Sequence, residues 1–255
     1  MKKIIVSGDS VSDLEFRSSS HPEMDTSWRK WPEYIAEYLD MELVCLARGG
    51  QGNDFVYSTL LDEITKTPKD EIGLVIAGWS QGQRRDWQIT SADDNLKHSW
   101  RSLPFDKHAP PESQTRKSLR NFQSLQILCE RYDLPCIQFQ TGHLFEDYYR
   151  AHNMNYNKPG QKVDLSDECH NFAKELDSVE RCLSIILSFE NIIDTSKFIG
   201  WPISEKIGGF SIQNKVLGHT LKETLERKLV ISEADSHPNE EGQKAIAEFL
   251  KGFIK

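Results

Sequence analysis

A chain of 255 residues, 38% hydrophobic and 27% charged, is long enough to bury the core of one α/β domain. Its net charge of −8 disfavours a nucleic-acid partner, because nucleic-acid binders more often carry a basic excess. No apolar run approaches the roughly 18 residues of a membrane span. The run that follows Lys2-Lys3 is too short for a signal peptide. We therefore expect a cytoplasmic protein without a nucleic-acid or membrane partner.

Apolar runs typical of buried strands alternate with amphipathic patterns typical of helices. Strands are expected at residues 2–7, 42–46, 72–77 and 135–140, and helices at 28–40, 54–66, 112–132 and 165–189. In the first helix the expected apolar face is Trp31, Ile35, Tyr38 and Leu39, and in the third strand Gly78 closes the run. Because a helix follows each strand, the order predicts right-handed crossovers and a parallel sheet.

Two polar stretches without periodicity interrupt this alternation, at residues 81–111 and 142–165. Each follows the end of an expected strand, and ligands of open α/β sheets bind outside the carboxyl ends of the strands. We therefore expect a single domain, residues 1–255, in which these two loop insertions shape a pocket. Residues 198–217 are rich in Gly and are expected to be irregular.

The last element is an amphipathic helix in which Pro238 suits the first position. Its apolar face is expected to consist of Gly242, Ala245, Ile246, Phe249, Leu250 and Phe253.

The five cysteines are odd in number and include no Cys-x-x-Cys pair, so neither a disulfide framework nor a zinc ribbon is expected. No two histidines combine helical ligand spacing with an acid, which disfavours a metal site. The glycine-rich run around Gly50 lacks the Lys-Ser/Thr of a phosphate-binding loop. We expect no metal and no organic cofactor.

Two short motifs at opposite ends of the chain supply the residue types that acyl transfer needs. Gly8-Asp9-Ser10 follows the first strand, and Asp235-Ser236-His237-Pro238-Asn239 opens the last helix. Acyl transfer uses a hydroxyl nucleophile, an imidazole that takes its proton and a carboxylate that orients the imidazole. The candidates are Ser10 as nucleophile, His237 as base and Asp235 as acid.

These motifs resemble the first and last blocks of the SGNH/GDSL hydrolases, and Trp31-Pro32 matches another common feature of that family. The resemblance implies a flavodoxin-like three-layer sandwich with a central parallel sheet. It also implies a serine esterase that hydrolyses a small acyl ester, such as a carbohydrate O-acetyl group. Gly52 falls in the place of the family glycine whose backbone N–H binds the oxyanion. The Ser10 N–H, the Gly52 N–H and Ser80 are then expected around the oxyanion.

The sequence departs from the family pattern at two places. The third block, normally Gly-x-Asn-Asp, reads Gly78-Trp79-Ser80-Gln81, so Ser80 replaces the oxyanion asparagine with a hydroxyl. The acid precedes His237 by two residues instead of three, so the turn must be rebuilt if Asp235 is to reach the imidazole. Otherwise Glu233, or no acid, serves. We therefore expect the acid to be the weak member of the site.

Other interpretations remain open from sequence. Gly78-Trp79-Ser80-Gln81-Gly82 satisfies the nucleophile elbow of α/β-hydrolases, with Ser80 as nucleophile. That elbow needs a helix directly after it, and the following Gln83 to Trp87 has no apolar helical face. Two further alternatives are a catalytically silent module that binds a carbohydrate or a protein, and an acyltransferase that uses the same site. Arg84-Arg85 is either a solvated charge pair or a binder of an anionic substrate group at the rim of the pocket.

Overall fold

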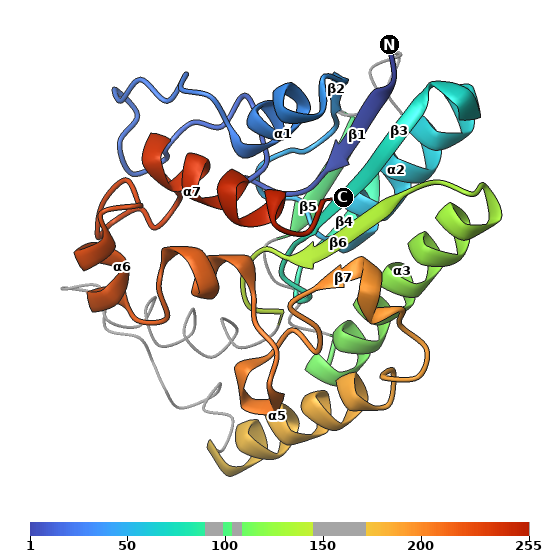
Figure 1. Cartoon of the computed structure of the whole chain (residues 1–255). Coiled ribbons are helices and arrows are strands. Elements are labelled where there is room, and N and C mark those ends of the chain that lie inside the picture. Colours follow the sequence, from blue (N-terminus) through green and yellow to red (C-terminus); the bar gives the residue numbers. More distant parts are fainter. Residues whose placement is uncertain (90–98, 104–108, 145–171, 255) are drawn as a thin grey trace.

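A five-stranded parallel sheet forms the centre of the protein (Figure 1). The computed structural model describes residues 1–89, 99–103, 109–144 and 172–254. The strands lie in the order β2-β1-β3-β6-β7 and pair in parallel throughout. They are β1 (Lys3–Ser7), β2 (Glu42–Cys45), β3 (Ile72–Trp79), β6 (Cys136–Gln140) and β7 (Phe198–Ile199). The expected α/β fold with a central parallel sheet is confirmed.

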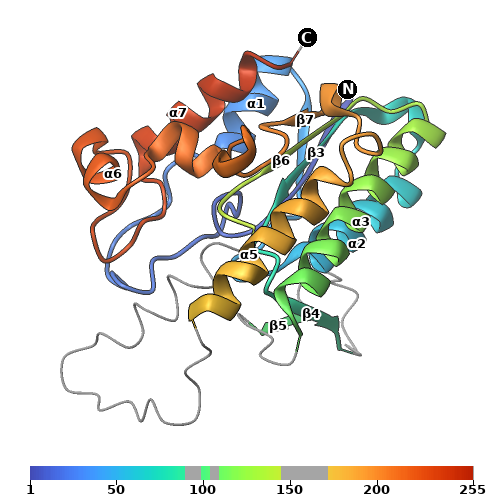
Figure 2. The same cartoon turned by 90° about the horizontal axis from the view of Figure 1, so that it is seen from below.

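Helices cover both faces of the sheet, which makes the expected three layers (Figure 2). Because strand side chains alternate between faces, Ile5 and Val75 pack towards α2, α3 and α5, whereas Ile4, Val6 and Ile76 pack towards α1 and α7. The helices are α1 (Trp31–Leu39), α2 (Asn53–Lys66), α3 (Pro111–Arg131), α5 (Phe172–Leu187), α6 (Leu221–Arg227) and α7 (Glu240–Lys251). No helix in the described ranges is long and apolar enough to cross a membrane.

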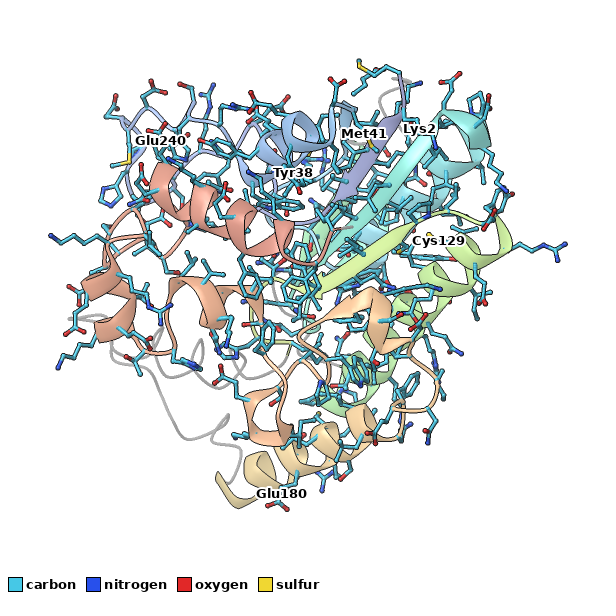
Figure 3. All side chains as sticks on the ribbon, viewed as in Figure 1. Lys2, Tyr38, Met41, Cys129, Glu180 and Glu240 are labelled. Carbon is cyan, nitrogen blue, oxygen red and sulfur yellow. The ribbon has the colours of Figure 1, made fainter. Side chains whose placement is uncertain are left out.

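Four details of the helices and strands differ from the expectation. Phe253, expected on the apolar face of the last helix, lies beyond the end of α7 and is 47% exposed. Strand β3 continues through Gly78 to Trp79. Tyr38, labelled on α1 in Figure 3, is 54% exposed instead of facing the core. Pro238 precedes α7 instead of opening it, because Asn239 is the cap and its side chain accepts the Gly242 N–H at 3.0 Å. That bond satisfies a backbone donor at the start of the helix, which proline cannot do.

The two insertions are described unequally. Within 81–111 the chain forms an antiparallel hairpin of β4 (Arg85–Gln88) and β5 (Trp100–Leu103), which packs beside α2 (Figure 2). Its strands carry polar residues on both faces, so no alternation marked them in the sequence. The insertion expected at 142–165 lies outside the described residues from 145 onwards. The irregular stretch 198–217 contains β7, whose two residues are too short to form a pattern.

Candidate active site

The turn after β1 places Ser10 at the carboxyl edge of the sheet. Asp9 Oδ1 accepts the Val11 N–H at 3.1 Å, and the Asp9 carbonyl accepts the Ser12 N–H at 3.0 Å. Gly8 allows the close packing of this turn, because an added Cβ would lie 2.6 Å from Ser12 Oγ and 3.1 Å from the Gly78 carbonyl oxygen. The first motif therefore forms a tight turn that projects Ser10 from the end of β1.

His237 lies between Ser10 and Asp235. Its Nε2 is 2.8 Å from Ser10 Oγ, and its Nδ1 is 2.6 Å from Asp235 Oδ1. A carboxylate at Nδ1 holds the proton on that nitrogen, which leaves Nε2 free to accept a proton from the serine hydroxyl. The three residues named from the two motifs therefore form a continuous chain of hydrogen bonds.

A closed loop brings Asp235 to the imidazole in spite of the shorter spacing. The Ile231 N–H donates to the His237 carbonyl at 2.9 Å, and the Ser232 N–H donates to the Asp235 carbonyl at 3.0 Å. Asp235 Oδ1 also accepts the His237 backbone N–H at 3.0 Å. The carboxylate thus binds both the backbone and the ring of His237, and the short spacing does not keep it from the imidazole.

Ser18 binds the other oxygen of the acid, and sequence reasoning missed it. Its hydroxyl donates to Asp235 Oδ2 at 2.5 Å and accepts the His21 N–H at 3.0 Å. Both Ser18 and Asp235 are buried. Burial raises the pKa of Asp235, but the hydrogen bonds from Ser18 and His237 outweigh burial and hold that pKa below its ordinary value. Nothing in the run Ser18-Ser19-Ser20 distinguishes this serine from its neighbours.

Residues 11–30, which lie in the segment between β1 and α1, hold the loop that carries the acid and base. Figure 1 shows this segment beside the start of α7. The Phe16 ring lies 4.4 Å from the His237 ring, centroid to centroid. Ser20 Oγ donates to the Ala234 carbonyl at 3.0 Å, and His21 Nε2 lies 2.7 Å from Ser232 Oγ. The base is therefore fixed by packing as well as by hydrogen bonds.

The Gly52 N–H, expected to bind the oxyanion, already has a partner in this arrangement. The Gly52 N–H donates to Asp86 Oδ1 at 2.8 Å, and the Phe55 N–H donates to Asp86 Oδ2 at 3.1 Å. Asp86 comes from β4 and places its carboxylate at the positive N-terminal end of α2. The Gly52 donor is already satisfied, and an added negative charge there would meet a carboxylate.

Ser80 is enclosed by polar partners. It has no exposed surface, its N–H donates to Asn53 Oδ1 at 2.7 Å, and its hydroxyl accepts a hydrogen bond from Arg84 Nη1 at 2.8 Å. Strand β4 follows it instead of the helix that a nucleophile elbow requires. The structure thus opposes the alternative with Ser80 as nucleophile, and a buried hydroxyl does not reach a bound ester.

Within the described part of the chain, the Ser10 N–H makes no hydrogen bond. Of the three donors expected around the oxyanion, the Ser10 N–H is therefore the one that is still available. The same part of the chain contains no group of three or more His, Cys, Asp or Glu side chains placed to hold a metal.

The chain is similar over its whole length to solved structures of GDSL and SGNH hydrolases. One, described as a lipolytic protein of the G-D-S-L family from Desulfitobacterium hafniense, is 14% identical, with a TM-score of 0.47 and 100% of both chains covered. Another, a psychrotrophic esterase from Pseudoalteromonas, is 13% identical, with a TM-score of 0.48, 100% of this chain covered and 97% of the esterase. No protein-family model matches the chain, and no curated protein matches its sequence. The likeness concerns the fold, and the function has to be argued from the site.

Proposed function

We propose that this protein is a serine esterase of the SGNH type that hydrolyses a small acyl ester. The observation that carries the proposal is the hydrogen-bonded chain from Ser10 through His237 to Asp235, with links of 2.8 Å and 2.6 Å. A hydroxyl, an imidazole and a buried carboxylate in this order are the parts of a Ser-His-Asp triad, which recurs on unrelated folds. A carbohydrate O-acetyl group is the substrate class that the family resemblance favours.

In this mechanism Ser10 Oγ attacks the ester carbonyl while His237 Nε2 takes the hydroxyl proton. The bond between the carbonyl carbon and the alcohol oxygen then breaks, and His237 gives the proton to the departing alcohol. Water attacks the acyl-serine in the second half, again with His237 as base. The bond between the acyl carbon and Ser10 Oγ then breaks, His237 returns the proton to Ser10 Oγ, and the carboxylic acid leaves. Asp235 holds the imidazole in orientation and stabilises its charged form in both halves.

The direct test combines a fluorophosphonate probe with a small chromogenic acetyl ester. Peptide mapping should find the probe on Ser10, and Ser10→Ala should lose both labelling and hydrolysis. Loss of a serine nucleophile costs on the order of 10⁶ in turnover. Ser80→Ala serves as the control, since a buried serine should not be labelled. Label on Ser80, or wild-type turnover by folded Ser10→Ala, would contradict the proposal.

A specific observation favours a second candidate, a catalytically silent module that binds a carbohydrate or a protein. The Gly52 N–H donates to Asp86, so one expected oxyanion donor is in use, and the other, the Ser80 hydroxyl, is fully buried. Loss of an oxyanion donor costs on the order of 10²–10³ in rate in another hydrolase. A wild-type protein that neither reacts with the fluorophosphonate nor hydrolyses the ester would favour this candidate.

A further inference from the structure

The side chain of Arg84 lies among the loops that follow three adjacent strands. Its Nη1 donates to the Gln51 carbonyl at 2.8 Å and to Ser80 Oγ at 2.8 Å, and lies 3.9 Å from Asp9 Oδ2. These partners follow β2, β3 and β1 in turn. The three donors expected around the oxyanion, the Ser10 N–H, the Gly52 N–H and the Ser80 hydroxyl, follow the same three strands. Arg84 therefore occupies the part of the site where those donors are expected.

Two neighbours fix Arg84 beside the nucleophile turn. A Cβ added to Gly52 would lie 2.7 Å from Arg84 Cβ, so the arginine packs directly on the position expected to bind the oxyanion. Asp9, which the guanidinium approaches, directly precedes Ser10 in the chain. The side chain of Arg84 thus extends from Gly52 to the turn that carries Ser10.

The guanidinium keeps unused donors. Arginine offers N–H groups on Nε, Nη1 and Nη2, and the hydrogen bonds of Arg84 in the described structure all leave from Nη1. The side chain is 16% exposed, so it is mostly shielded from water but still accessible. A fixed positive charge in such a place stabilises developing negative charge far better than one in bulk water.

We propose that Arg84 is a catalytic residue that binds the oxyanion of the tetrahedral intermediate, in place of the missing asparagine. The inference rests on the proposed esterase function. When Ser10 Oγ bonds to the carbonyl carbon, the carbonyl electron pair moves onto oxygen, and the free N–H groups of Arg84 and the Ser10 N–H bind that oxygen. The positive charge of Arg84 also offsets the nearby carboxylate of Asp9. Collapse of the intermediate returns the pair to the carbonyl and expels the alcohol.

The test compares Arg84→Ala, Arg84→Lys and the neighbouring Arg85→Ala, all on a neutral acetyl ester. Arg84→Ala should lower kcat about 10²–10³-fold, the cost of one oxyanion donor in another hydrolase, with little change in KM. It should lose affinity for a boronic acid that mimics the tetrahedral intermediate, and guanidinium salts should restore part of the turnover. The kcat of Arg84→Lys should lie between that of wild type and that of Arg84→Ala. The kcat of Arg85→Ala should equal that of wild type.

Each other outcome overturns the inference in a recognisable way. Wild-type kcat in folded Arg84→Ala shows that the oxyanion is held elsewhere. Lost turnover with unchanged boronic acid affinity and no rescue by guanidinium shows a structural role. A loss confined to esters that carry a carboxylate shows that Arg84 binds the substrate anion instead. If wild type neither hydrolyses the ester nor reacts at Ser10 with a fluorophosphonate, the esterase function itself has failed.

Discussion

Removing the Ser18 hydroxyl should take one hydrogen bond from Asp235, the acid of the proposed triad, and leave Ser10 and His237 unchanged. Ser18→Ala leaves Asp235 Oδ2 buried without the 2.5 Å hydrogen bond that it now accepts, while Oδ1 keeps the ring and backbone of His237. A hydrogen bond to a charged group contributes about 1.5–3 kcal/mol to stability. Because Asp235 keeps its other partners, we expect a loss near the lower end of that range, about 1.5 kcal/mol in the free energy of unfolding at neutral pH.

The same change should have a defined pH dependence. The pKa of Asp235 is held below its ordinary value, so its contribution to stability is present above the unfolded pKa and is lost as pH falls through the folded pKa. Ser18→Ala removes one cause of the low pKa and raises it. The destabilisation should therefore be largest at neutral pH and shrink in acid, where both forms carry a protonated Asp235.

Urea unfolding at neutral and acidic pH measures the stability difference, and hydrolysis of a chromogenic acetyl ester measures kcat. We expect kcat to fall about tenfold, the equivalent of about 1.4 kcal/mol. That is much less than the loss of about 10⁴ caused by replacing a triad acid with its amide. Ser19→Ala is the matched control, because Ser19 is the exposed next residue. If Ser18→Ala matched Ser19→Ala in stability and in kcat, the reasoning would be refuted.

Two more predictions follow from the turns that carry the site. Asp235→Asn should lower kcat about 10⁴-fold, a loss close to that of His237→Ala, because Asp235 is hydrogen-bonded to the imidazole ring. A much smaller loss in the folded variant would show that Asp235 is a weak member of the site. Gly8→Ala should lower the free energy of unfolding by about 1–3 kcal/mol through overpacking against Ser12 and Gly78. Gly49→Ala, whose Cβ would meet its neighbours at ordinary distances of 3.6 Å and more, should be tolerated in a urea melt.

Local patterns in the sequence predicted four of the five strands of the sheet and the three residues of the proposed triad. Strand β1 and its turn follow from a short apolar run that ends in Gly8-Asp9-Ser10, and α7 follows from its apolar face. Each of these patterns consists of residues that are neighbours in the chain, so it can be recognised without knowledge of the fold. The order of strands and helices then places both motifs at one edge of the sheet.

Long-range contacts without a local signature account for what the sequence did not predict. Ser18 reaches Asp235 across 217 positions of the chain, and Asp86 reaches Gly52 from a hairpin that shows no alternation. Matching Gly52 to a family position identified its place but not its partner. An N–H that is free in one protein can be occupied in another, because a single carboxylate from an insertion suffices to cap the helix.

Asp86 and Asp235 should leave opposite signatures in the pH dependence of stability. Burial raises the pKa of Asp86 by more than the Phe55 and Gly52 N–H groups lower it, whereas the pKa of Asp235 is lowered. A carboxylate with a raised folded pKa binds a proton more readily in the folded state, so it stabilises the fold as pH falls through that pKa. The cost of Asp86→Ala in urea unfolding should therefore grow from neutral pH towards the ordinary carboxyl range, about pH 4. The cost of Asp235→Ala should shrink as pH falls below that range. If the cost of Asp86→Ala shrank in acid as well, the pKa of Asp86 would be lowered by the helix N-terminus more than burial raises it, and the reasoning would be wrong.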